Sequence, residues 1–551
     1  MEAFTIDKWS AQYRTILVAL CVVLFPLAIG SVHLFDWDEV NFAEASREML
    51  VNNNFMNVQI NYLPFWEKPP LFFWLQVVCM KLVGVNEWGS RLPNVLVGLI
   101  SVLFIYSIGK KVVSKKFGFI WGLAYIGSFL PHFYFKSGII DPLFNLFIFL
   151  ALYYFYLYQQ HYQKKYVLIA AVLSGLAVLT KGPVGVLLIF LVVVIYILAK
   201  WKDIQLKMLD IALVVLIIVG ITSVWFIAEL INGGGIEVFK EFFDYQVRLF
   251  TSSEAGHGQP FYYHFIVLFF GCFPISLIAF PYLLRKKFGV ETQPMVQNFY
   301  MLNFILFWVV LLLFSFTTTK IVHYSSLCYF PLSFIAAYVL YQKTNANRPI
   351  STLSFVLIAL VGVIISILFT ALPLVVRFKN EIIPFIKDPF AVANITMPVA
   401  WSGYEFLIGI CYFLVFVYIL FLLKKNTHYI AHFFILNAVM LNVLMIFIVP
   451  KVEQHVQGSL IEFFEKHQSS NEYVVTYGFK SYAQYFYTKK VNPTNALAKN
   501  DQWLYEGAID KPTYIVCKIM NKEQVELLEG THYLYEKGGF AFFVRHPKTI
   551  K

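Results

Sequence analysis

The chain has 551 residues, of which 59% are hydrophobic, 19% aromatic and only 14% charged. A soluble protein carries about 45–50% apolar and about 25% charged residues, so few charges would have to cover too much apolar surface in water. The composition argues against a soluble enzyme, a nucleic-acid-binding module and a disordered scaffold. It predicts a polytopic membrane protein. The six cysteines are scattered without CxxC or metal-ligand spacing, which argues against a disulfide framework or a zinc knuckle.

Apolar windows near the length that spans a bilayer follow one another along the chain, and they predict thirteen transmembrane helices. The windows lie at 13–35, 92–109, 117–134, 141–158, 166–180, 183–199, 208–231, 261–284, 298–315, 321–341, 352–373, 403–423 and 428–449. Lys181, Gly182 and Pro183 divide one long apolar stretch into two short helices.

Charge alternates between successive connections. Basic residues such as Lys110, Lys111, Lys424 and Lys425 gather in one alternate set of short connections, whereas most acidic residues lie in the other set. Because short basic loops stay in the cytoplasm, we expect the N-terminus inside and the C-terminus outside the membrane. The formal charge of +11 is then mainly an orientation signal.

The composition changes after Pro450, where charges become frequent and apolar runs become short. We expect an all-α membrane domain over residues 1–450, with long outer segments at 36–91, 232–260 and 373–402, and a small soluble α/β domain over 451–551. In that second domain the pattern predicts strands at 474–477 and 514–518 and helices at 457–467 and 522–528.

The first outer segment is itself amphipathic. One face of a helix would present Phe42, Ala45, Met49 and Leu50, and the other would present Glu44, Arg47 and Glu48. This pattern predicts a helix that lies on the membrane surface.

Acidic residues are absent from the middle of every predicted span. They lie at outer ends or in outer loops, as Asp38, Glu39, Glu67, Asp141, Glu229, Asp244 and Glu254 do. Transporters usually place ionisable groups near the bilayer midplane. The distribution therefore favours an enzyme that acts on a lipid-borne substrate over a transporter.

Two motifs of the first outer segment suit such chemistry. The carboxylates of Asp38 and Glu39 can bind a sugar hydroxyl, hold a metal or deprotonate an acceptor, although acids also stabilise a helix start. Lys68 suits a phosphate and Trp66 a sugar ring, while the same residues would also form an interfacial aromatic belt with a snorkelling lysine.

Further candidates follow at later outer positions. Asp141 opens a predicted span before Pro142 and suits either a site or a helix cap. Lys181, where two short helices meet, suits a phosphate contact or a snorkelling lysine. His257 lies between two glycines in the 240s–250s segment as a metal ligand or hydrogen bonder. Lys320 and Tyr324 would share one helix face and grip a phosphate, or anchor the span at the interface.

At these residues the sequence resembles a known family. The segment from Asp38 to Met49 is similar to the first exterior loop of the bacterial aminoarabinose transferases of lipid A. Five further motifs match in the same order: Trp66-Glu67-Lys68-Pro69-Pro70, Ile140-Asp141-Pro142, Thr180-Lys181-Gly182, the 240s segment with His257, and Lys320 with Tyr324. The chain differs where Asn41 and Phe42 replace an Arg and a Tyr of those enzymes, and where Ile321-Val322-His323-Tyr324 replaces their Leu-Pro-Thr-Tyr.

The resemblance implies a GT-C glycosyltransferase fold, shared with the protein O-mannosyltransferases, with thirteen spans and a periplasmic α/β domain. It implies catalytic roles for the carboxylates Asp38, Glu39 and Asp141. It further implies donor-phosphate binding by Lys68, Lys181, Arg248, Lys320 and Tyr324. Glu67 and His257 would correspond to metal-binding positions, for zinc, magnesium or manganese, and no nucleotide cofactor is needed.

The expected function is transfer of a sugar from an undecaprenyl-phosphate donor to an acceptor at the periplasmic face of a bacterial inner membrane. The acceptor would be of the lipid A type, as for 4-amino-4-deoxy-L-arabinose transferases. Protein O-glycosylation or transfer to another surface glycan is an alternative in the same class, and a lipid-linked sugar flippase is an alternative of another class. The expected partners are membrane lipids, the lipid-linked donor and a lipid, glycan or protein acceptor, with no nucleic acid.

Overall fold

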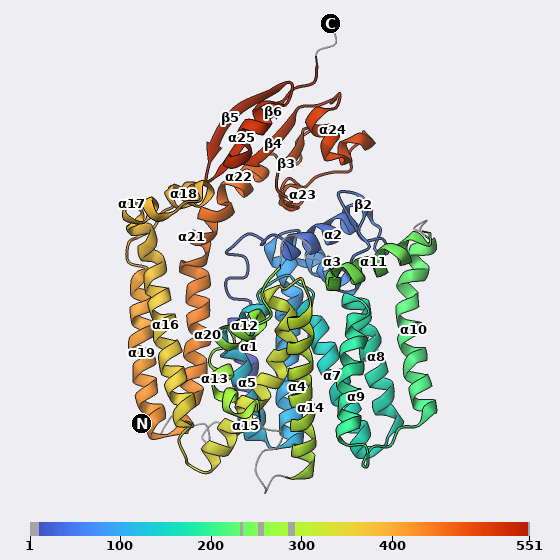
Figure 1. Cartoon of the computed structure of the whole chain (residues 1–551), viewed down its shortest axis with the longest axis vertical. Coiled ribbons are helices and arrows are strands. Elements are labelled where there is room, and N and C mark those ends of the chain that lie inside the picture. The colour runs from blue at the N-terminus through green and yellow to red at the C-terminus, as the bar shows by residue number, and fades with distance from the viewer. Residues whose placement is uncertain (1–9, 232–234, 252–257, 285–292, 549–551) are drawn as a thin grey trace.

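The computed structural model describes residues 10–231, 235–251, 258–284 and 293–548. A bundle of long helices carries a small α/β domain at one end, and the chain passes from one to the other through α20 (Ile430–Phe447) and α21 (Val449–Glu453) (Figure 1). The second domain lies over the end of the bundle where α2 (Asp38–Asn52) and α3 (Leu71–Val83) are found. This arrangement agrees with the expected fold class.

Eight helices in the described part of the chain are long and apolar enough to cross a membrane, or nine if one bent pair counts as a single span. The eight are α4 (Glu87–Val112), α7 (Asp141–His161), α10 (Met208–Ile231), α14 (Pro294–Phe316), η5 (Val322–Cys328) with α15 (Tyr329–Asn345), α16 (Thr352–Arg377), α19 (Phe406–Lys425), and η7 (Thr427–Tyr429) with α20. The bent pair is α12 (Tyr263–Gly271) with α13 (Ile275–Ala279) and η4 (Phe280–Tyr282), which meet at 107°.

The other predicted windows fall on helices that are shorter, broken or flanked by lysines. They are α1 (Tyr13–Leu24), α5 (Lys115–Ile126) with α6 (Phe129–Tyr134), α8 (Lys164–Lys181) and α9 (Val184–Ala199). Every predicted window therefore contains helix, but length and composition alone select only eight or nine spans. The count of thirteen stays a prediction.

The predicted break between two short helices is confirmed. Helix α8 ends at Lys181 and α9 begins at Val184. Gly182 between them has a φ of +96°, a conformation that only glycine adopts without strain. The two helices pack side by side, and Lys181 is thereby held at the end of the bundle that carries α2 (Figure 1).

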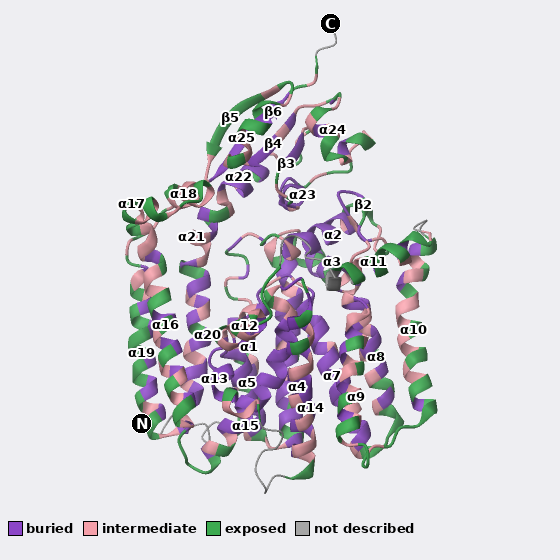
Figure 2. Cartoon of the chain, in the orientation of Figure 1, coloured by how far each residue is buried: buried purple, intermediate pink, exposed green. Residues whose placement is uncertain are grey.

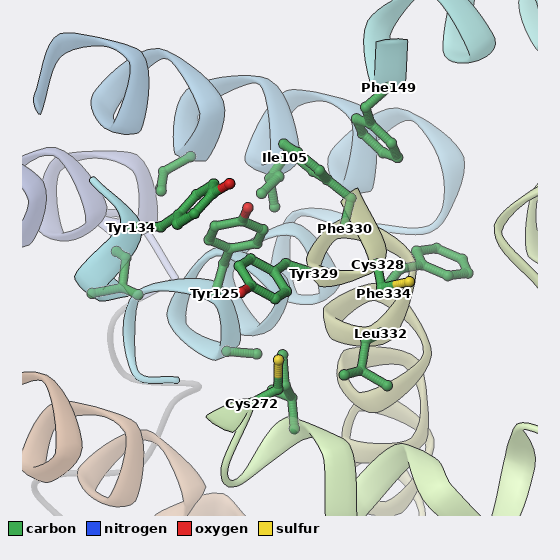
Figure 3. Close-up of a cluster of buried hydrophobic side chains, with 14 of the residues drawn as sticks. Ile105, Tyr125, Tyr134, Phe149, Cys272, Cys328, Tyr329, Phe330, Leu332 and Phe334 are labelled. Carbon is green, nitrogen blue, oxygen red and sulfur yellow. The ribbon is translucent and has the colours of Figure 1, made fainter. Parts of the chain in front are cut away.

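Aromatic side chains fill the centre of the bundle (Figure 3). Phe149 of α7 stacks on Phe330 of α15 with ring centroids 4.4 Å apart, and Tyr125 of α5 packs tilted against Phe330 at 5.1 Å. Burial is greatest in this central group, whereas α10, α16 and α19 expose long apolar faces (Figure 2). Such faces are expected where helices meet lipid.

The amphipathic helix α2 forms as predicted, but its polar face does not meet solvent. Glu44, Arg47 and Glu48 are all buried. The guanidinium of Arg47 donates to the Glu44 carboxylate at 2.6 Å and to the backbone carbonyl of Lys490 at 2.7 Å. The C-terminal domain folds back and covers the polar face, a contact that local periodicity does not encode. The placement of α2 at the membrane surface stays a prediction.

The C-terminal domain has one mixed four-stranded sheet in the order β3-β4-β6-β5. Strands β3 (Tyr473–Tyr477) and β4 (Thr513–Lys518) are parallel, and β6 (Phe540–Arg545) pairs antiparallel with β4 and with β5 (Thr531–Lys537). Around it lie α22 (Ser459–Lys466), α23 (Ala483–Tyr487), α24 (Asp501–Glu506) and α25 (Lys522–Glu526). The two predicted strands and two predicted helices are confirmed, while the β5–β6 hairpin is additional.

The remaining elements lie in the connections. They are β1 (Gln59–Ile60), β2 (Leu63–Pro64), α11 (Glu237–Thr251), α17 (Lys379–Ile382), η6 (Ile383–Phe385), α18 (Pro389–Thr396), η8 (Gln454–Gly458), η9 (Ala496–Lys499) and η10 (Ile519–Asn521). Much of the outer segment expected at 232–260 is helix α11, because Val238 and Phe242, one turn apart, are buried, Phe242 against Trp225 of α10.

Candidate active site

A cavity of about 340 Å³ opens at the end of the bundle that carries α2. Six of the predicted site residues line it: Asp38, Glu39, Lys68, Asp141, Lys181 and Tyr324. They come from the starts of α2 and α7, the end of α8, η5, and the loop before α3. Segments far apart in the sequence thus bring acids, cations and aromatic rings to one place.

Asp38 begins α2, where the helix dipole favours a carboxylate. Its side chain is 26% exposed, and its Oδ2 lies 3.2 Å from Nε2 of His323. Burial by itself would raise the pKa of Asp38, but the hydrogen bond and charge of His323, together with the charges of Lys68 and Lys181, outweigh it and hold the pKa below its usual value. Asp38 is therefore an ionised carboxylate at neutral pH.

Asp141 is the second acid of the cavity and opens α7, as the sequence predicts. Its Oδ1 accepts a hydrogen bond from Nζ of Lys181. Its Oδ2 is buried, accepts no hydrogen bond from any described residue, and lies 3.9 Å from Nε2 of His323. His323 thus stands between the two carboxylates.

Lys68 faces the same space from the loop before α3. Its Nζ donates to the phenol of Tyr245 at 3.0 Å and lies 4.3 Å from the centre of that ring. Burial lowers the pKa of Lys68, and the negative charges of Glu67, Asp38 and Asp141 oppose that shift only in part. A buried ammonium of this kind gains most from an anionic partner.

Lys181 and Tyr324 also line the cavity. The ammonium of Lys181 lies 5.0 Å from the ring centre of Tyr324 and 5.7 Å from that of Phe144. Lys181 is 15% exposed and its partner Asp141 only 3%. Two lysines and a phenol therefore border one cavity, an arrangement that suits a phosphate group.

Glu39 lies in the cavity wall but is engaged by Arg91 of α4. The two side chains form a two-point ion pair with both N–O distances at 2.8 Å. The carboxylate also accepts from the backbone N–H groups of Phe35 and Gly138. Arg91 in turn donates to three backbone carbonyls between Ile29 and His33. These contacts favour a structural role for Glu39, which holds the loop before α2, over the predicted catalytic one.

Two predicted phosphate ligands lie outside the cavity lining. Lys320 precedes η5 and does not share a helix face with Tyr324, so the expected i, i+4 pair does not form. Lys320 is buried and donates to the backbone carbonyl of Thr317. Arg248 is exposed on α11, where its guanidinium lies 5.9 Å from the ring centre of Tyr245, a residue of the cavity wall.

The predicted metal positions were Glu67 and His257. Glu67 is half-buried next to Lys68, and His257 lies outside the described residues. Within 10–231, 235–251, 258–284 and 293–548, no group of three or more His, Cys, Asp or Glu side chains is placed to hold a metal ion. The described side chains therefore do not form a metal centre by themselves, and metal binding stays a prediction.

Three residues of the site were not predicted. In the sequence, His323 stands out only because it departs from the Leu-Pro-Thr-Tyr pattern. Tyr245 is one of several aromatic residues in its segment, and Arg91 is a single charge next to a predicted span. A lone histidine at a span end carries no distinctive pattern, so its place between Asp38 and Asp141 emerges only from the fold. Chemically, the site offers a proton acceptor in Asp38 next to cations that can stabilise a departing phosphate.

Part of the sequence is similar to known glycosyltransferases. Residues 67–226 match the family model described as dolichyl-phosphate-mannose-protein mannosyltransferase. Two relatives are named undecaprenyl phosphate-alpha-4-amino-4-deoxy-L-arabinose arabinosyl transferase. The one from Pectobacterium carotovorum is 26% identical over 59% of this chain and 58% of its own length. The one from Proteus mirabilis is 27% identical over 61% of this chain and 61% of its own length. The chain thus matches about three-fifths of the length of these curated relatives.

Solved structures agree over nearly the whole chain. ArnT from Cupriavidus metallidurans bound to undecaprenyl phosphate superposes with a TM-score of 0.72 at 17% identity, covering 96% of this chain and 97% of that one. The Archaeoglobus fulgidus oligosaccharyltransferase superposes with a TM-score of 0.53 at 12% identity, over 98% and 75%. The chain thus shares the fold of ArnT over nearly its whole length, and part of its sequence is similar to the arabinosyl transferases and to the protein mannosyltransferase family.

Proposed function

We propose that the chain transfers a sugar from a polyprenyl phosphate, of the undecaprenyl type, to an acceptor at the outer face of the membrane. The observation that carries this proposal is the cavity in which ionised Asp38 faces Lys68, Lys181 and Tyr324. The names of the curated relatives, and the undecaprenyl phosphate bound in the superposed ArnT structure, support the same donor class.

The lysines of the cavity act on the donor phosphate. As the bond between the anomeric carbon and the phosphate oxygen breaks, negative charge grows on the leaving phosphate. Lys68 and Lys181 are placed to stabilise that charge in a partly dry site, where such interactions are strong. Tyr324 supplies a phenol from the cavity wall, and Arg248 is near enough through Tyr245 to add charge at the rim.

Asp38 acts on the acceptor. When the acceptor is a hydroxyl, its oxygen attacks the anomeric carbon, its proton passes to the Asp38 carboxylate, and the polyprenyl phosphate leaves as the new glycosidic bond forms. A single displacement of this kind inverts the anomeric centre. When the acceptor is an ionised phosphate, no proton is removed and Asp38 only orients it.

The names of the relatives support a proposal for the sugar, and the acceptor class is inferred from that sugar. Their printed names point to 4-amino-4-deoxy-L-arabinose as donor sugar and so to a lipid A-type acceptor. The protein mannosyltransferase family match leaves protein or surface-glycan acceptors as the alternative of the same class. A lipid-linked sugar flippase is the alternative from another class, and the charged side chains gathered at one end of the bundle argue against it.

The setting is a bacterial inner membrane crossed several times, with the N-terminus in the cytoplasm and the α/β domain in the periplasm. The alternation of basic and acidic connections supports this orientation. A divalent metal at Glu67 and His257 belongs to the same proposal, and no nucleotide cofactor is required.

The experiment that tests the function compares cells with and without the protein. Mass spectrometry of lipid A and of surface glycans should show a sugar mass present only when the protein is made. The same additional mass on proteins alone would favour O-glycosylation. Unchanged lipid A, glycans and proteins, together with accumulation of the lipid-linked sugar on one side of the membrane, would favour the flippase.

A further inference from the structure

The C-terminal domain reaches the mouth of the cavity through one short segment. Residues 480–482 follow strand β3 and lead into helix α23. They lie against Asp36 and Trp37, which are themselves part of the cavity wall. The mouth cluster, defined as Asp36, Trp37, Lys480, Ser481 and Tyr482, thus joins the two domains at the entrance of the site.

Hydrogen bonds fix the two halves of the mouth cluster against each other. The carboxylate of Asp36 accepts from the hydroxyl of Ser481 and from the backbone N–H of Tyr482. Ser481 is buried, whereas Asp36 is exposed and keeps one side of its carboxylate toward solvent. The mouth cluster is therefore a built feature of the fold rather than a chance approach of two surfaces.

Aromatic rings form the floor of the mouth cluster. The rings of Trp37 and Tyr482 meet edge to face with centroids 5.5 Å apart. Both are half-buried, so each keeps an exposed part of its surface beside the cavity. Paired rings at a partly wet opening are well suited to the apolar face of a sugar ring.

A cation completes the arrangement. The ammonium of Lys480 lies 4.8 Å from the Trp37 ring centre and 5.4 Å from that of Tyr482. Lys480 is exposed. The two rings therefore hold the ammonium at the entrance, where an anion on an incoming molecule meets it directly.

We propose that the mouth cluster is the acceptor-binding subsite, and that it selects a saccharide that carries an anionic group. The sugar ring packs on Trp37 and Tyr482, and Lys480 pairs with a phosphate or carboxylate on that sugar. This inference rests on the proposed function and assigns to the C-terminal domain a part of the substrate selection. The sugar to be modified is then held at the cavity entrance, on the side of Asp36 and Asp38.

The test is direct binding by the full chain in detergent micelles. The probes are three soluble disaccharides of glucosamine type: one that carries a phosphate, one with a carboxylate in place of the phosphate, and one that is neutral. An exposed ion pair contributes about 0.5–1 kcal/mol, or roughly a two- to fivefold preference in dissociation constant. We expect the wild-type chain to prefer an anionic disaccharide over the neutral one by about this factor.

Lys480→Gln should abolish the preference and leave the affinity for the neutral disaccharide unchanged. Lys466→Gln is the matched control, since Lys466 lies in the same domain with its side chain 63% exposed. Trp37→Ala should weaken binding of all three disaccharides, and it should also reduce the anionic preference, because Lys480 loses one of the two rings that hold it. A preference for phosphate alone or for carboxylate alone names the anion of the acceptor.

Two results would overturn the inference: no preference in the wild-type chain, or a preference that survives Lys480→Gln. Binding of undecaprenyl phosphate, measured in parallel, should be the same in wild type and Lys480→Gln. Loss of the sugar preference with donor binding intact supports the acceptor subsite. Absence of donor binding and of sugar transfer in the wild type would instead reject the proposed function, whatever Lys480 does.

Discussion

The imidazole of His323 lies between the two acids of the cavity, with Nε2 3.2 Å from Oδ2 of Asp38 and 3.9 Å from Oδ2 of Asp141. One ring nitrogen thus faces carboxylates from the starts of two helices, α2 and α7. A single N–H donates strongly to only one of them, and the shorter distance assigns it to Asp38. His323 therefore fixes the direction in which Asp38 presents its oxygens to an acceptor.

Replacing His323 tests that positioning. We expect His323→Ala to lower kcat about 10- to 100-fold, because a misoriented carboxylate loses the attack geometry, while KM for the lipid donor changes little. His323→Gln keeps an N–H donor of similar reach and should recover part of the rate. Steady-state transfer by the purified protein measures both. A wild-type kcat in His323→Ala would show that His323 does not position Asp38.

The pH dependence of donor binding follows from Lys68. Burial lowers the pKa of its ammonium below the usual value of about 10.4, despite the nearby acids. Attraction to the donor phosphate is therefore present below this lowered pKa and is lost as the pH rises through it. As the pH is raised, KM for the donor should therefore increase at a lower pH than the one at which a free lysine loses its proton.

Lys68→Arg provides the control for that titration. Its guanidinium keeps its charge throughout the range, so the alkaline rise in KM should move to higher pH or disappear. A profile with the same alkaline limb in wild type and Lys68→Arg would show that another group titrates.

The Glu39–Arg91 pair predicts a stability effect rather than a catalytic one. Arg91→Met leaves the Glu39 carboxylate buried and without its cation, which we expect to cost about 3–5 kcal/mol of folding free energy. The double variant Glu39→Gln with Arg91→Met removes both charges and should recover much of that loss. Thermal unfolding in detergent measures the difference, with Lys466→Met as a surface control. Equal stability of Arg91→Met and wild type would contradict the structural role.

Sequence patterns predicted well what depends on local chemistry. Apolar windows predicted the positions of the helices, and the Gly182 break predicted the turn between α8 and α9. The ordered motifs predicted that Asp38, Lys68 and Lys181 belong to one site, and all three line the cavity. Each of these follows from hydrophobicity, from backbone freedom or from a resemblance spread over the chain.

Contacts between segments far apart in the chain could not be predicted from the sequence patterns. The polar face of α2 looked solvated because nothing in its periodicity reveals that the backbone of Lys490 accepts from Arg47. The i, i+4 spacing of Lys320 and Tyr324 assumed a helix that begins only at Val322. His323 looked like an ordinary span-end residue until the fold placed it between two carboxylates from other helices.

The most direct test of the whole account is Asp38→Asn, which keeps the shape of the side chain and removes its charge. Transfer from a synthetic undecaprenyl-phosphate sugar should fall about 10²–10⁴-fold if the acceptor is a hydroxyl, because the proton acceptor is gone. Binding of undecaprenyl phosphate should persist through Lys68 and Lys181, and Asp203→Asn, an exposed carboxylate at 71% exposure, should behave as wild type. Undiminished sugar transfer by Asp38→Asn would contradict the account.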